Sequence, residues 1–173
     1  MKNFFKKLLF ENEKFKNISS SCSAQNNLLP NIICRSKSNE IRKIFNLPES
    51  DYFTQLNQDF FALLINSFKR NLFFIEIGAN DGYDLSNTIY LEENFGWNGL
   101  LIEPNPNYFN SLKRRKSKHV PYAVSDVEHE IEFLQNGLYG GISEFIDKSH
   151  TNYDSKSNLI KVKTKKLEEI LID

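Results

Sequence analysis

The sequence predicts an α/β fold in which a doubly wound sheet is made mainly of parallel strands. Three short segments, Leu72–Ile77, Leu100–Ile102 and His119–Val124, carry this prediction because their continuous apolar runs are typical of strands buried on both faces. Segments with helical periodicity lie between them. The order is therefore strand, helix, strand, helix, strand, which is the pattern of parallel sheets with helices on their faces.

Segments whose apolar residues have helical spacing precede the first predicted strand and lie between the following ones. The predicted helices cover Asp51–Arg70, Asp84–Phe95, and a segment from Asn105 to the basic run Lys113–Lys118. Ser50 or Asp51 is the expected N-cap of the first helix, and Gly96 is placed to end the second. Asn105 is the expected cap of the third, since Pro106 follows in the favoured first position.

After residue 126 the pattern changes. Glu130–Leu134 alternates in part and predicts a strand with one solvated face, while Leu159–Thr164 predicts a partner or edge strand. Lys165–Leu171 predicts a short helix. The predicted organisation is an N-terminal helical extension, consisting of a leader and an irregular linker over residues 1–50, followed by one domain over residues 51–173.

Composition excludes several classes of protein. Lys plus Arg and Asp plus Glu number 22 each, so no global charge favours nucleic acid or an anionic membrane. Residues 3–16 have a weak amphipathic pattern, but a leader that is unstructured or docked on the domain is favoured over an interfacial helix. The apolar runs there are too short for a signal peptide or transmembrane segment, so a cytoplasmic protein with reduced Cys22 and Cys34 is expected. No histidine spacing predicts a metal site.

The segment Glu76–Gly82 is the predicted ligand-binding loop, because it lies between a predicted strand and a predicted helix. Its glycines allow a sharp turn and close approach of the backbone to a ligand. Glu103 ends the next strand, 21 residues after Gly82. At that place a carboxylate can accept hydrogen bonds from both ribose hydroxyls of an adenosine.

The spacing of this loop favours one nucleotide cofactor over another. A dinucleotide fingerprint reads GxGxxG, whereas this loop is GxxxG and contains Asn80 and Asp81. Acidic groups at Glu76 and Asp81 repel a pyrophosphate but tolerate the sulfonium and ammonium of S-adenosylmethionine. S-adenosylmethionine is therefore favoured over NAD. A tight turn with no ligand remains the structural alternative.

The chain resembles the FkbM-type methyltransferases over roughly residues 52–173. The segments that carry the resemblance are Gln55–Asp59, Phe74–Gly82, Leu85–Thr88, Leu91–Glu92, Phe95–Gly99, Leu101–Pro106 and Tyr122–Asp126. The resemblance implies a class I methyltransferase fold, which is Rossmann-like, with S-adenosylmethionine as methyl donor. It also implies methyl transfer to a hydroxyl oxygen of a sugar, polyketide or other small metabolite.

The resemblance also assigns residues by position. It implies that the methionine part of the donor is held by Glu76, Gly78, Ala79, Asn80, Asp81 and Gly82. It implies that Ser86 orients the carboxylate of the donor, and that Glu103 with Pro104 binds the ribose. It places Ser125 and Asp126 beside the adenine, and Gln58 and Asp59 where they close over donor or acceptor. The family often has Gly where this chain has Asn57.

The family pattern continues into a fourth parallel strand, but this chain stops at Asp173. We therefore expect a C-terminally incomplete sheet in which Leu72–Ile77 has an open edge, left bare in a fragment or covered by a partner chain. The first hypothesis is an S-adenosylmethionine-dependent O-methyltransferase acting on a small or carbohydrate acceptor. The second is a non-catalytic protein that binds S-adenosylmethionine or another partner. No catalytic residue is assigned.

Overall fold

A computed structural model describes residues 38–52, 54, 56–147, 149 and 157–172. The amphipathic segment 3–16, Cys22 and Cys34 lie outside the described residues. The chain divides into two compact units, one formed by the chain up to Leu72 with Asp84–Trp97, and one by Phe73–Tyr83 with the chain from Asn98 onward. No helix in the described ranges is long and apolar enough to cross a membrane.

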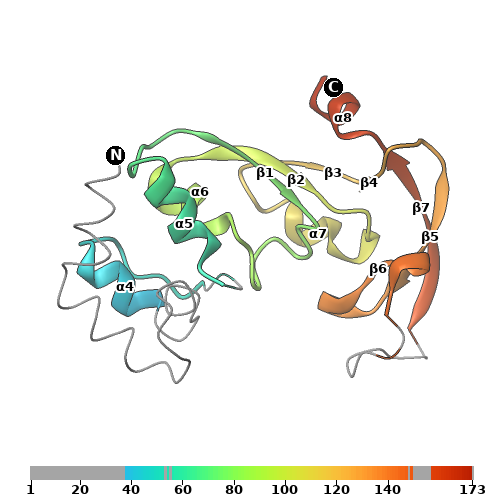
Figure 1. Cartoon of the computed structure of the whole chain (residues 1–173), viewed down its shortest axis with the longest axis horizontal. Coiled ribbons are helices and arrows are strands. Elements are labelled where there is room, and N and C mark those ends of the chain that lie inside the picture. The colour runs from blue at the N-terminus through green and yellow to red at the C-terminus, as the bar shows by residue number, and fades with distance from the viewer. Residues whose placement is uncertain (1–37, 53, 55, 148, 150–156, 173) are drawn as a thin grey trace. The chain divides into compact units, whose positions relative to one another are not determined.

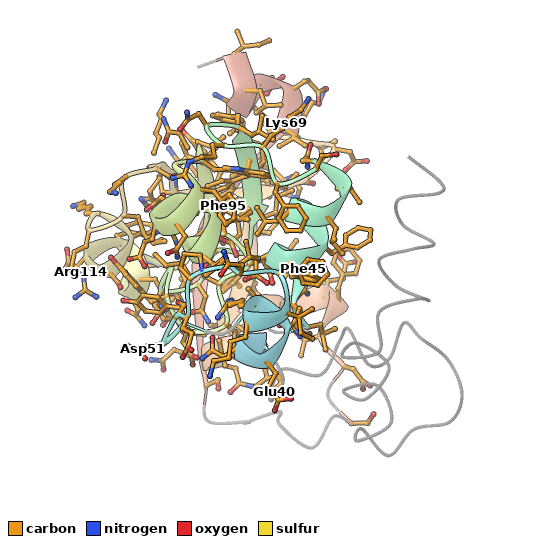
Figure 2. The ribbon with its side chains drawn as sticks, turned by 90° about the vertical axis from the view of Figure 1, so that its left-hand side faces the viewer. Glu40, Phe45, Asp51, Lys69, Phe95 and Arg114 are labelled. Atoms are coloured by element: carbon orange, nitrogen blue, oxygen red, sulfur yellow. The ribbon has the colours of Figure 1, made fainter. Side chains whose placement is uncertain are left out.

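In its described residues the first unit contains the helices α4 Ser38–Ile44, α5 Gln58–Ile65 and α6 Ile89–Phe95 (Figure 1). Its apolar core joins α4 to α5 through Ile41, Phe60 and Leu64, which are all at least 97% buried. The ring of Phe45, labelled in Figure 2, lies 4.9 Å from the ring of Phe60 and extends this core. Aromatic packing of this kind stabilises the unit by burying large rings.

The helix predicted over Asp51–Arg70 is present but shorter. It begins at Gln58, so the expected cap at Ser50 or Asp51 is wrong. Two features hold the preceding segment out of the helix: Asn57 has a left-handed backbone with φ 58, and Thr54 forms a parallel bridge with Leu85. Both depend on contacts distant in sequence, so helical periodicity alone does not show them.

The helix predicted over Asp84–Phe95 also begins late, at Ile89. Leu85 has a left-handed backbone with φ 59, which no helix permits. The Ser86 Oγ accepts hydrogen bonds from the backbone N–H groups of Thr88 at 3.3 Å and Ile89 at 3.2 Å, and so stabilises the start of α6. Gly96 ends the helix with φ 66, as predicted.

Helix α4 was not predicted, because Ser38 and Asn39 belong to a stretch that reads as an irregular connection. A buried ion pair explains its position: Arg42 Nη2 lies 2.9 Å from Asp59 Oδ2, with side chains 3% and 1% exposed. The other carboxylate oxygen of Asp59 accepts from Thr54 Oγ1 at 3.0 Å and from the N–H of Phe60 at 2.7 Å. One carboxylate thus joins α4, the extended segment and the first turn of α5.

Tyr90 of α6 belongs to the same buried network. The guanidinium carbon of Arg42 lies 4.0 Å from the centre of the Tyr90 ring, and Tyr90 Oη donates to the carbonyl of Pro48 at 2.7 Å. Burial raises the pKa of Tyr90 to about 12, with a smaller opposing effect from the charge of Arg42. The phenol is therefore a neutral hydrogen-bond donor at physiological pH.

The second unit contains a parallel sheet in the order β1 Phe73–Ile77, β2 Asn98–Ile102, β3 Lys118–Val120 (Figure 1). Both pairings are parallel, which confirms the mixed α/β class with a parallel sheet. The prediction that the first strand is buried on both faces is wrong. Phe74 and Glu76 are buried, whereas Phe73, Ile75 and Ile77 are exposed.

The predicted third strand, His119–Val124, is split in two. β3 ends at Val120, and β4 Ala123–Val124 pairs with another strand, β7 Asn158–Lys165. Pro121 lies at the break. Because proline has no N–H to donate, it cannot continue a sheet ladder there.

A second sheet follows in the order β4-β7-β5-β6, with β5 Glu130–Gln135 and β6 Gly141–Ile142. β5 and β7 pair antiparallel over their length, which confirms both predicted strands and their partnership. The short helices in this region are η3 Gly137–Tyr139, η4 Ser143–Phe145 and α8 Leu167–Ile172. Ile170 of the predicted C-terminal helix packs on Leu100 and Ile102 of the parallel sheet.

The buried ion pair gives a prediction for stability. Arg42→Met leaves the Asp59 carboxylate buried without its counterion, so it should lower the free energy of unfolding by about 3–5 kcal/mol. Lys43→Met is the matched control on the same helix, because the Lys43–Glu49 pair is 65% and 59% exposed. It should change stability by no more than about 1 kcal/mol. Urea denaturation followed by circular dichroism measures both, and equal losses would contradict a special role for Asp59.

Candidate functional site

The loop after β1 turns back against the end of β2. The backbone N–H groups of Gly78 and Ala79 both donate to the carbonyl of Ile102, at 2.9 and 3.2 Å. The N–H of Gly82 then donates to the carbonyl of Ala79 at 2.9 Å, which closes a turn around Asn80 and Asp81. The loop therefore starts where the parallel strands end, at the carboxyl edge of the sheet where α/β proteins bind their ligands.

Glu103 joins this loop to the segment after β2. Its Oε2 accepts from the N–H of Asn80 at 2.9 Å, and its Oε1 accepts from the N–H of Asn105 at 2.8 Å. The residue is 5% exposed. Each carboxylate oxygen can accept more than one hydrogen bond, so both oxygens keep acceptor capacity toward a ligand.

The segment after Glu103 is capped as predicted. Asn105 Oδ1 accepts from the N–H of Asn107 at 3.2 Å and from Gln135 Nε2 at 2.8 Å. The first turn is a 3₁₀ helix, η2 Pro106–Tyr108, and α7 Phe109–Leu112 follows. The contact with Gln135 ties this turn to β5.

Burial controls the titration of the groups around Glu103. It raises the pKa of Glu103 above its ordinary value, while the N–H groups of Asn105 and Asn80 lower it in part. It also raises the pKa of Tyr108, and the negative charges of Glu103 and Asp81 add to that effect. Burial lowers the pKa of His119, whose ring lies 4.7 Å from the ring of Phe109. Only the shift of Tyr108 includes an effect of negative charge, from Glu103 and Asp81.

One polar atom in the loop is buried without a hydrogen-bond partner in the described part of the chain: Asn80 Oδ1. A buried acceptor that lacks a donor costs free energy, so such atoms often mark a place where a ligand donates. Asn80 precedes Asp81 in the chain, and its N–H is bound by Glu103, so a cationic donor such as an ammonium group would suit this acceptor. These residues fit the amino acid end and the ribose of S-adenosylmethionine.

The far end of the loop is packed closely against α7 and the turn after it. A Cβ atom at Gly82 would lie 2.8 Å from Leu112 Cδ2 and 3.3 Å from Arg115 Cγ. Arg115 is 6% exposed, and its Nη1 donates to the carbonyl of Gly82. Arg114 (Figure 2) is exposed, and its guanidinium carbon lies 5.1 Å from the centre of the Tyr83 ring. The basic run thus supplies one buried structural residue among solvated cations.

Ser125 and Asp126 follow β4 and are held by contacts with their own neighbours and with β7. The N–H of Ser125 donates to the carbonyl of Lys165 at 3.2 Å, and its Oγ donates to Asp126 Oδ1 at 3.3 Å. Pro104 is buried directly after Glu103. A hydrogen bond brings Asn80 and Glu103 together, whereas Ser125 and Asp126 lie at the end of a strand in the other sheet.

Three further predicted residues, Gln58, Asp59 and Ser86, belong to the first unit. Gln58 Oε1 accepts from the N–H of Leu56 at 2.7 Å. Asp59 is 1% exposed in its ion pair with Arg42, and Ser86 is 3% exposed at the start of α6. The structure shows a structural use for each of these side chains, and their contact with donor or acceptor stays a prediction of the resemblance.

Tyr108 is a residue near the site that the sequence interpretation missed. Its phenol lies close enough to Glu103 and Asp81 for both charges to raise its pKa. The sequence feature that could have identified Tyr108 is its place in the first helical turn after the predicted N-cap, Asn105. That cap follows closely on Glu103, the acidic residue at the end of a predicted strand. No group of three or more His, Cys, Asp or Glu side chains in the described ranges could hold a metal ion.

The fold and the loop define a mixed α/β protein whose candidate ligand-binding residues follow the ends of parallel strands. A family model described as the methyltransferase FkbM domain matches residues 76–173. The chain belongs to this family, as its motifs predicted, and the class of activity that goes with it is methyl transfer. Searches of curated proteins and of solved structures found no match.

The two glycines of the loop allow a test of its packing. Gly78 and Gly82 have φ 72 and 80, but a Cβ at Gly78 would meet no atom within 4 Å. Gly78→Ala should therefore lower the free energy of unfolding only by the cost of holding an alanine in the left-handed backbone conformation, about 1–2 kcal/mol. Gly82→Ala should lower the free energy of unfolding by about 1–3 kcal/mol more than Gly78→Ala, because its Cβ would clash with Leu112. Urea denaturation of both variants checks this order, and equal losses would show that the loop relaxes away from α7.

Proposed function

We propose that this protein is an S-adenosylmethionine-dependent methyltransferase with a Rossmann-like, doubly wound fold. The loop Glu76–Gly82 would hold the methionine part of the donor, and Glu103 would bind the ribose. The acceptor would be a hydroxyl oxygen of a carbohydrate or another small metabolite. Membership of the FkbM methyltransferase family supports the reaction class.

The observation that carries the proposal is the position of Glu103. Its two oxygens are fixed in direction by the N–H groups of Asn80 and Asn105, at 2.9 and 2.8 Å. A carboxylate held in this way is oriented before the ligand binds, so little freedom is lost when it accepts two hydroxyl groups. The two hydroxyls of a ribose have the spacing that a single carboxylate accepts.

The charge of the loop supports a cationic donor over a dinucleotide. The unpaired Asn80 Oδ1 can accept from an ammonium, and the carboxylates of Asp81 and Glu103 attract positive charge. A pyrophosphate needs donors from the loop, but the N–H groups of Gly78, Ala79, Asn80 and Gly82 are all engaged within the protein. NAD is therefore the weaker candidate.

A donor held by the loop Glu76–Gly82 and by Glu103 would supply an electrophilic methyl group for transfer to a hydroxyl oxygen. The residues described above bind and orient the donor, and positioning of this kind lowers the barrier to group transfer. The residue that receives the acceptor proton is not assigned. A protein that binds the donor without methylating an acceptor is the second candidate.

The donor assignment can be tested by isothermal titration calorimetry of the full chain with S-adenosylmethionine. We expect binding to the wild type, and at least about tenfold weaker binding to Glu103→Gln, because a charge-assisted hydrogen bond contributes about 1.5–3 kcal/mol. Affinity should also fall as pH drops through the raised pKa of Glu103, since the protonated carboxyl accepts fewer hydrogen bonds. The Glu103→Gln variant should lose that pH dependence.

Glu132→Gln is the matched control, because Glu132 is an exposed glutamate on β5 of the same unit. It should bind like the wild type. Thermal melting of each variant separates lost binding from lost folding. A folded wild type that binds no S-adenosylmethionine, or that binds NAD more tightly, would overturn the donor assignment. Binding without methyl transfer to any hydroxylated acceptor would favour the second candidate.

A further inference from the structure

The polar side chain of Gln135 lies at the end of the inner face of β5. Side chains alternate along a strand, so Ile131, Phe133 and Gln135 share one face. Phe133 packs there on Ala123 and Val162 in a buried apolar cluster, and Ile131 lies partly buried against it. Gln135 therefore continues an apolar row with an amide, at the point where β5 leads into η3.

A hydrogen bond fixes this amide beside the turn η2 that follows Glu103. Gln135 Nε2 donates to Asn105 Oδ1 at 2.8 Å, and the same oxygen accepts from the N–H of Asn107 at 3.2 Å. Because Asn105 Oδ1 is an acceptor, the atom of Gln135 that faces it must be the amide nitrogen. This contact uses one N–H of the amide, so the second N–H and Oε1 keep capacity toward a ligand.

Asn105 connects the amide of Gln135 to the carboxylate of Glu103. The N–H of Asn105 donates to Glu103 Oε1 at 2.8 Å, while its side chain accepts from Gln135 at the same distance. Two hydrogen bonds and one short side chain separate the two groups, so they lie within about 10 Å of each other. An adenosine whose ribose hydroxyls bind a carboxylate extends its base over a comparable distance.

Apolar side chains that suit a flat base lie close to Gln135 in the chain. Leu138 and Tyr139 follow in η3 and are 45% and 52% exposed. Tyr108 belongs to the turn η2, where its N–H donates to the carbonyl of Asn105 at 3.2 Å. Small-molecule sites combine apolar and aromatic lining with a few polar groups that fix the orientation of the ligand. The residues around the Gln135 amide therefore match the chemistry of a nucleobase.

We propose that Gln135 recognises the polar edge of the adenine of S-adenosylmethionine, an inference that rests on the proposed function. Adenine presents an acceptor at N7 and a donor at its exocyclic amine, N6. A glutamine amide carries the complementary pair, so Oε1 accepts from N6 while Nε2 donates to N7. Hypoxanthine has a carbonyl in place of the amine, presents two acceptors at this edge, and cannot form the same pair.

Isothermal titration calorimetry of the full chain with S-adenosylhomocysteine and S-inosylhomocysteine tests the proposal. We expect the wild type to bind the adenosyl compound at least about fivefold more tightly, because a bidentate amide–adenine pair discriminates by that factor or more. In Gln135→Leu the ratio of the two dissociation constants should approach one. If Gln135 only positioned Asn105, its loss would weaken both compounds equally and leave the ratio unchanged.

Gln135→Lys gives a second, independent readout. Its ammonium can still donate to Asn105, and it offers donors to both acceptors of hypoxanthine, so the preference should reverse toward the inosyl compound. Glu132→Leu is the control, because Glu132 is exposed on the opposite face of β5, and it should keep the wild-type ratio. Glu103→Gln should weaken both compounds alike, since both contain the same ribose.

The outcomes separate the role of Gln135 from the donor assignment. Equal binding of both compounds by the wild type, an unchanged ratio in Gln135→Leu, or a Gln135→Lys that still prefers the adenosyl compound would overturn the role of Gln135 alone. A folded wild type that binds neither compound would overturn the donor assignment as well. Circular dichroism checks the folding of each variant, and the reversal in Gln135→Lys decides if Gln135→Leu does not fold.

Discussion

The carboxylate of Glu103 is the interaction on which the second unit depends most. It accepts one N–H from the loop after β1 and another from the turn after β2, so a single side chain fixes two adjacent strand ends relative to each other. Its burial raises its pKa, which shows that the fold keeps this group despite a cost of desolvation. This agreement of position and burial is the reason why Glu103 is the centre of the proposed site.

The first unit also contains a buried carboxylate that joins several segments, Asp59, but its hydrogen-bond partners differ from those of Glu103. There both carboxylate oxygens are used by Arg42, Thr54 and the start of α5, and the side chain is 1% exposed. In the described part of the chain the Glu103 carboxylate accepts from the neutral backbone N–H groups of Asn80 and Asn105, whereas Asp59 is neutralised by a guanidinium. The charge of the Glu103 carboxylate is therefore not neutralised by a cationic partner in the way that Arg42 neutralises Asp59.

The elements predicted correctly are those determined by local signals. The apolar runs of β1 and β2, the alternation of β5 and β7, and the Asn105 cap all depend on neighbouring residues. The late starts of α5 and α6 could not be predicted, because left-handed Asn57 and Leu85 depend on contacts with distant segments. For the candidate site, spacing predicted that the loop and Glu103 follow strand ends, and their contact with a ligand stays a prediction; only the structure reveals that Asn80 donates to Glu103 while its own Oδ1 lacks a donor.

The alternation along β1 separates two sets of peptide groups and side chains. Phe74 and Glu76 face the buried side, and Gly78 continues their hydrogen bonding to β2 and into the loop. Phe73, Ile75 and Ile77 carry the exposed side chains of the strand. The pairing that brings the loop to Glu103 therefore depends on the peptide groups of the buried set, because these are the groups directed toward β2.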